Sequence, residues 1–80
     1  MKPIYVKWHD AVSDDAWIDK ENHTDLEIHV IHTLGFLVHE DSKKIIVAMQ
    51  WDPEREGISM RMAIPKAWII KRRFLRVGIK

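Results

Sequence analysis

The residues best suited to chemistry in this chain are cations gathered near its C-terminal end. Lys71, Arg72 and Arg73 follow one another, and Arg61 precedes them. Residues 57–80 hold seven Lys and Arg and no acid, so this segment carries +7 while the rest of the chain carries −6. Because no acid balances these cations nearby in the sequence, the pattern predicts a surface that binds phosphate or another anion.

Two further residues complete a predicted ligand site. Trp51 comes just before a turn, and we expect its indole to be partly exposed and able to stack on a base. Asp10 follows the first apolar run, and its carboxylate could bond loop backbone amides or the polar edge of a ligand. The predicted ligand-binding residues are Asp10, Trp51, Arg61, Lys71, Arg72 and Arg73.

Two other interpretations of the basic segment stay open. Charged side chains on an edge strand deter aggregation, and both faces of the last strand are expected to be basic. The acidic residues of 14–27 could also pair with this strand, within one chain or between copies. A chain of this size buries only about 60% of its unfolded surface and gains stability by association, so we expect a homo-oligomer.

The composition of the chain excludes several kinds of functional site. There is no Cys, which excludes disulfides and zinc–thiolate sites. His9, His29 and His39 could share one face, but the pattern is too loose to predict a metal site, and no catalytic triad is apparent. No apolar run approaches the roughly 20 residues of a membrane span, and no signal peptide is apparent. We expect a cytoplasmic protein with one domain over 1–80, no enzymatic activity, no cofactor and no membrane partner.

The elements that must position these residues are five strands and one short helix. Alternating polarity predicts strands over 3–10, 27–39 and 58–64, a nearly continuous apolar run predicts a central strand over 44–51, and a last strand is expected over 68–77. Ser13 before two Asp residues predicts a helix over about 14–21, in the first long loop. Trp17 is expected to hold this loop against the body, and Gly35 predicts a bend in the second strand. The apolar faces are predicted to include Ile4, Val6, Trp8, Ile28, Val30, Leu34, Phe36, Val38, Ile58, Met60, Met62, Ile64 and Trp68.

The turn before the last strand indicates the fold class. Pro65 cannot donate to a sheet ladder, so it ends the fourth strand and begins a single helical turn. Five short strands, an early loop with a short helix, and this turn predict an all-β, small five-stranded SH3-like barrel. An Sm-like or OB-like barrel is the competing prediction.

Short motifs spread over most of the chain are Trp8-His9-Asp10-Ala11, Trp17, Leu34-Gly35-Phe36-Leu37-Val38, Ile46-Val47-Ala48 and Ile64-Pro65-Lys66. In this combination the chain resembles a group of small uncharacterised phage and prophage proteins. The resemblance implies a phage-encoded accessory protein with a small barrel fold, present in the host cytoplasm, and it carries no established reaction. The late turn also resembles the end of SH3 domains, but their paired Trp is missing here, so polyproline binding is not expected.

The leading hypothesis is a non-enzymatic binding module, acting as a phage accessory or counter-defence protein that holds a nucleotide or short nucleic acid. Arg61, Lys71, Arg72 and Arg73 would contact phosphate while Trp51 stacks on a base. The alternative is an adaptor that binds a host or virion protein. Phosphate binding should weaken steeply with salt, whereas an apolar protein interface should resist it.

Overall fold

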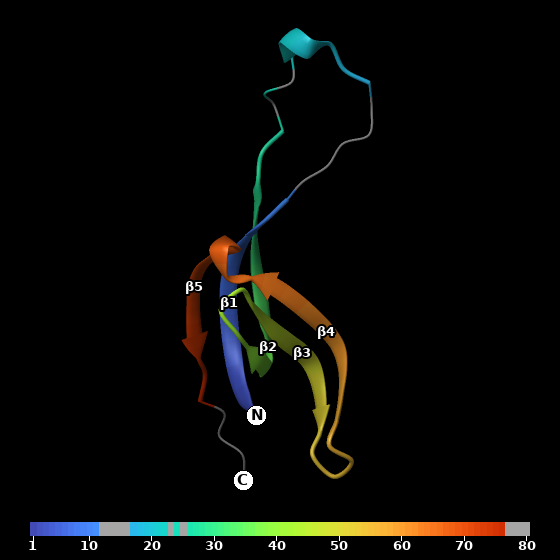
Figure 1. Cartoon of the computed structure of the whole chain (residues 1–80), viewed down its shortest axis with the longest axis vertical. Coiled ribbons are helices and arrows are strands. Elements are labelled where there is room, and N and C mark those ends of the chain that lie inside the picture. The colour runs from blue at the N-terminus through green and yellow to red at the C-terminus, as the bar shows by residue number, and fades with distance from the viewer. Residues whose placement is uncertain (12–16, 23, 25, 77–80) are drawn as a thin grey trace.

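The computed structural model describes residues 1–11, 17–22, 24 and 26–76 and contains one antiparallel sheet of five strands, in the order β4-β3-β2-β1-β5 (Figure 1). The predicted strands are confirmed to within a few residues at each end. Their bounds are β1 (Lys2–Asp10), β2 (His29–Glu40), β3 (Lys44–Asp52), β4 (Gly57–Pro65) and β5 (Ile69–Phe74), with 3-10 turns η1 (Lys20–Asn22) and η2 (Lys66–Trp68).

The core lies on one face of the sheet. Ile4, Val6 and Trp8 alternate along β1 and are buried there, as their period of two predicts. The indole Nε1 of Trp8 donates a hydrogen bond of 3.0 Å to Thr33 Oγ1, which satisfies the polar groups of both side chains inside the core. The remaining buried apolar residues are Ile45, Val47, Ala48 and Ile64.

Strand β2 is bent because it must pair with two neighbours in succession. Its first part pairs with β1 up to Leu37, and its last part pairs with β3 from Phe36 onward, with a register shift between Leu37 and His39. Gly35 lies beside the bend, where a Cβ atom would come within 2.5 Å of a Val47 methyl and 2.6 Å of the Ala48 carbonyl oxygen. The predicted bend is confirmed, and the close approach of β3 explains the glycine.

The expected barrel does not close, because β4 and β5 are the two edges of the sheet and do not pair with each other. Their chain connection is η2, whose Lys66 amide donates to the Lys43 carbonyl oxygen at 2.9 Å. We call the gap between β4 and β5 the open seam. Arg72 is directly opposite Val6, so its side chain lies on the core face beside this seam. A closed barrel would bury that charge at considerable cost, whereas the open seam leaves it exposed.

The open seam overturns part of the predicted core. Met60 and Met62 of β4 were expected to point inward but are 66% and 43% exposed, since no strand covers them. Trp68 in η2 is also exposed rather than buried. In β2 the predicted apolar face is wrong, because Val30 and Leu34 are exposed while Thr33 occupies the core. Thr33 is directly opposite the buried Val6, so Thr33 faces the core, and Val30 and Leu34 emerge on the other side of the sheet.

The described residues between β1 and β2, which are 11, 17–22, 24 and 26–28, project from the sheet as an arm, and the molecule has extents of 57 × 26 × 23 Å (Figure 1). The short helix predicted over 14–21 is not found: residues 14–16 lie outside the described residues, and the described part has only the turn η1. Trp17 is fully exposed and does not hold the arm against the body. The sequence-based expectation for Trp17 is therefore wrong.

Candidate anion-binding face

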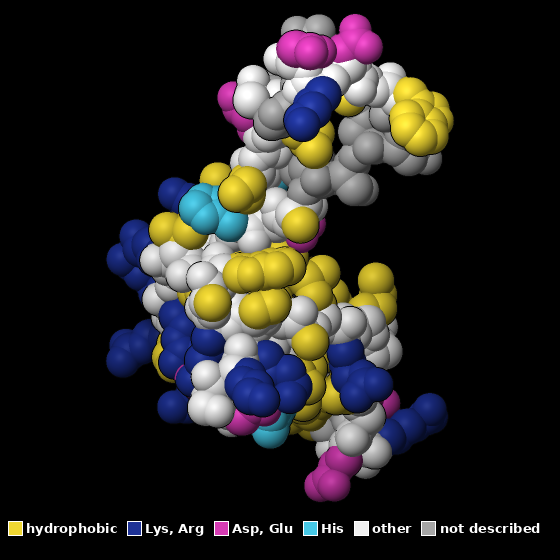
Figure 2. Space-filling view, turned by 45° about the horizontal axis from the view of Figure 1, so that its top comes forward, with side chains coloured by type: hydrophobic (Ala, Val, Ile, Leu, Met, Phe, Trp, Pro, Cys, Tyr) yellow, Lys and Arg dark blue, Asp and Glu magenta, His cyan; other side chains and the backbone are white. Residues whose placement is uncertain are grey.

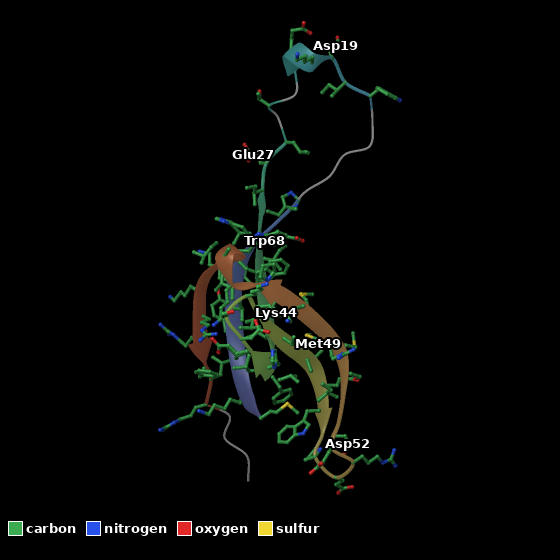
Figure 3. The ribbon with its side chains drawn as sticks, in the orientation of Figure 1. Asp19, Glu27, Lys44, Met49, Asp52 and Trp68 are labelled. Carbon is green, nitrogen blue, oxygen red and sulfur yellow. The ribbon has the colours of Figure 1, made fainter. Side chains whose placement is uncertain are left out.

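The predicted ligand-binding residues do not converge on one site. Asp10 lines a cavity of about 410 Å³ at the base of the arm, together with Ile28 and Trp68. Trp51 lies at the far end of the molecule, next to Asp52, as the positions of Asp52 and Trp68 in Figure 3 show. The Trp51 ring makes an edge contact with the Phe36 ring, with 5.6 Å between the centroids. Trp51 is half-buried, which agrees with the predicted partial exposure of its indole.

The predicted cations are divided between the two edges of the sheet. Arg61 lies on β4, opposite Ala48, whereas Lys71, Arg72 and Arg73 lie on β5. Only the β5 residues adjoin β1, and the register then separates them by face. Lys71 and Arg73 emerge on the side opposite the core, and Arg72 emerges on the core side.

Arg72 is neutralised within the fold, contrary to the expectation that no acid balances the basic strand. Its Nη2 donates to Glu40 Oε2 at 3.0 Å, and Lys66 Nζ lies 2.7 Å from the same oxygen. These hydrogen bonds, the one from Arg72 foremost, hold the pKa of the Glu40 carboxyl below its ordinary value. The end of β2 is thereby joined to both η2 and β5 across the open seam. The sequence separation of Glu40 from Arg72 hides this pairing.

The neighbouring Asp41 organises the turn between β2 and β3. Its Oδ1 accepts from the backbone amides of Lys43 and Lys44, and its Oδ2 lies 2.9 Å from both His39 Nε2 and Lys44 Nζ. These contacts, led by the His39 hydrogen bond, lower the pKa of the Asp41 carboxyl strongly. Asp41 is therefore a turn-capping residue and contributes no free charge to a ligand.

Lys71 and Arg73 join residues of β1 and β2 on the side of the sheet away from the core. Lys71 is directly opposite Lys7, and Arg73 is directly opposite Tyr5. On the other side of β1, Lys7 is opposite His32. Among the residues that the structure describes, no carboxylate forms an ion pair with any of the three cations. We call this surface the outer basic face: Tyr5, Lys7, His32, Lys71 and Arg73.

The two rings of the outer basic face are fixed against each other. Tyr5 Oη lies 2.7 Å from His32 Nδ1, and the rings stack with centroids 5.9 Å apart and planes inclined by 16°. Planar groups held in this way present a rigid aromatic surface beside the cations. Figure 2 shows Lys and Arg gathered on the body and acidic side chains at the far end of the arm.

Sequence reasoning missed Tyr5, Lys7 and His32 because they lie far from the basic segment in the chain. The alternation of β1 does indicate that Tyr5 and Lys7 face away from Ile4 and Val6. The missing information is that β5 pairs with β1, which only the topology supplies. Lys71 and Arg73 alone among the predicted residues belong to the outer basic face.

Within the described residues, no cluster of three or more His, Asp or Glu has a metal-binding arrangement, and no helix has the length and apolar character to cross a bilayer. Comparisons with protein-family models, with curated proteins and with solved structures found no match to this chain.

Proposed function

We propose that this protein is a small non-enzymatic binding module that holds a phosphate-bearing ligand, a nucleotide or short nucleic acid, on its outer basic face. The observation that carries the proposal is the placement of Lys7 directly opposite Lys71. Like charges at opposed positions of an antiparallel pair destabilise a sheet, typically by about 0.2–1 kcal/mol. An anion bound over the two ammonium groups would remove that repulsion.

The surroundings of the lysines favour a nucleic acid over a simple anion. Arg73 beside Tyr5 adds a planar cation that suits phosphate, and the Tyr5–His32 pair supplies ring surface next to it. The face is part of an open sheet, and the cavity near Asp10 lies at the base of the arm instead. An extended ligand laid across β1 and β5 fits this arrangement better than an enclosed mononucleotide.

We also propose a fold family and an origin for this protein. The order β5-β1-β2-β3-β4 and the turn η2 between β4 and β5 support an SH3-like barrel that has remained open at its seam. We also propose, from the resemblance of its motifs to those of small phage and prophage proteins, a phage-encoded accessory role in the host cytoplasm, including sequestration of a host signalling nucleotide.

The test is a fluorescence titration of labelled single-stranded oligonucleotides and mononucleotides with the full chain. Three phosphate contacts on a single strand predict a slope of about −2 for log affinity against log salt. The variant Lys71→Gln with Arg73→Gln should lose most of the binding. Arg55→Gln is the matched control, because Arg55 is highly exposed and lies at the distant β3–β4 turn. Equal losses in the two variants, or binding unaffected by salt, would contradict the proposal.

A second function is favoured by the arm. Trp17 is fully exposed, and Ile18 and Leu26 are at least half exposed, which is unusual for apolar side chains grouped on one projection. These residues support an adaptor that binds a host or virion protein through the arm. That function predicts binding that resists salt and is lost in Trp17→Ser, with Lys71→Gln and Arg73→Gln having no effect.

A further inference from the structure

Among the described residues, the three longest stretches of strand with an unpaired hydrogen-bonding edge lie at different places in the sheet. Two are the terminal strands β4 and β5. The third is the first part of β2, residues 29–35, because β3 joins β2 only from Phe36 onward. Within the described part of the chain, β1 is the only strand that pairs with this stretch. Unpaired edges are templates for the addition of another strand unless the sequence protects them.

The edges of β5 and β4 are both protected against the addition of another strand. Half of the six residues of β5 are cations, Lys71, Arg72 and Arg73, which repel an identical strand. In β4, Met60 has a φ of 56°, in the left-handed region, and its pairing with β3 is interrupted there. Pro65 ends the same strand and has no amide hydrogen to donate. Neither edge offers a regular, uncharged ladder.

The edge of β2 has none of these features. Residues 29–35 contain no Lys, Arg, Asp, Glu or Pro, and their ladder to β1 runs without a register shift. On the face away from the core, three apolar side chains near His32 are exposed: Ile28, Val30 and Leu34, at 65%, 44% and 57%. A regular edge without Lys, Arg, Asp, Glu or Pro is an interaction surface or an aggregation site.

We propose that this edge pairs with the same edge of a second copy, forming a two-fold symmetric dimer through antiparallel β2 strands. A second copy fits because an antiparallel pair of identical strands is self-complementary, and the edge carries no charge that would repel itself. The small core also favours association, since seven apolar side chains are buried among the described residues. Sheet pairing would give the exposed side chains of Val30 and Leu34 cross-strand neighbours from the second copy.

The dimer would also create a continuous surface from two outer basic faces. Residues 29–35 and β5 both adjoin β1, on opposite sides, so β5, β1 and β2 of each copy would form one six-stranded sheet. A two-fold axis perpendicular to that sheet places both sets of Lys7, Lys71 and Arg73 on the same side. The dimer itself does not depend on the proposed ligand.

The test is sedimentation equilibrium of the full chain without ligand, over a dilution series. The wild type should be a dimer, and Val30→Lys with Leu34→Lys should be a monomer with an unchanged circular dichroism spectrum. Met62→Lys is the matched control, because Met62 is an equally exposed apolar residue on the β4 edge, and it should remain dimeric. A monomeric wild type, or a dimer lost in Met62→Lys and retained in the β2 variant, would overturn the proposal.

Hydrogen exchange of the wild type gives a measurement that does not depend on variants folding. The amides of residues 29–35 that are not bonded to β1 should be protected at high protein concentration and exchange faster on dilution. Protection that is absent at every concentration would overturn the proposal. Amides of β4 and β5 at the two outer edges should exchange rapidly throughout.

Discussion

The two faces of the β5-β1-β2 part of the sheet come from the same strands and differ in how their charges are treated. On the core face, Ile4, Val6 and Trp8 are buried, and the one cation of β5, Arg72, is paired with Glu40. On the outer face, Lys7 opposes Lys71 and no carboxylate is paired with either among the described residues. The core face thus pairs the charge that it carries, whereas the outer face leaves two like charges opposed, which is the arrangement on which the proposed function is based.

The largest expected effect is a loss of stability on truncation of a core residue of β4. It tests whether the core face is uncovered along this strand. Ile64 is fully buried and Met62, two residues away on the same strand, is 43% exposed. Ile64→Ala should lower the free energy of unfolding by about 2–5 kcal/mol, and Met62→Ala by much less. Urea denaturation measures both. Similar losses at the two positions would mean that β4 is covered in solution and that the barrel closes.

A smaller loss is expected from Gly35→Ala, where the bend of β2 brings the strands together. The added methyl group would approach the Ala48 carbonyl oxygen at 2.6 Å, which backbone movement must relieve. We expect a loss of about 1–3 kcal/mol in urea denaturation, as for other overpacked sites. Gly57→Ala is the control, because no atom lies within 4 Å of a Cβ atom there. Equal stability of the two variants would contradict the close packing of β2 on β3.

Acid should weaken the contacts that hold the seam and the β2–β3 turn. The pKa values of Glu40 and Asp41 are lowered in the folded state, so the unfolded chain binds more protons at acid pH. The stability from these carboxylates is present above their ordinary pKa values, near 4, and is lost as the pH falls further. Urea midpoints measured from pH 7 to pH 2 should therefore decline below about pH 4. In Asp41→Asn this decline should be shallower, and an identical decline would contradict the assigned contacts.

The smallest expected effect is on the outer face, where a substitution should raise the stability of the fold instead of lowering it. Lys7→Gln removes a like-charge pair and should raise stability at low salt by up to about 1 kcal/mol. The same variant should bind labelled oligonucleotides more weakly, because a phosphate contact is lost. Thermal unfolding and a binding titration on one preparation measure both quantities. A variant that is less stable and binds normally would show that Lys7 belongs to the structural framework.

Local pattern was enough to predict the five strands and the buried face of β1. Alternation with a period of two is fixed by the strand backbone, so Ile4, Val6 and Trp8 had to share a face whichever strands lie beside them. The same argument separates Lys71 and Arg73 from Arg72, and the structure confirms that separation. Pro65 likewise marks the end of β4 without knowledge of its neighbours.

Tertiary structure alone decided which strands meet and where the sheet stops. Pairing of β5 with β1 brings Lys71 beside Lys7, and the bend of β2 brings Glu40 to Arg72, although 32 residues separate that second pair. The predicted core positions of Met60 and Met62 failed because burial depends on a covering strand, and β5 does not pair with β4. Residue periodicity determines which side of a strand a side chain occupies, whereas long-range pairing determines what that side faces.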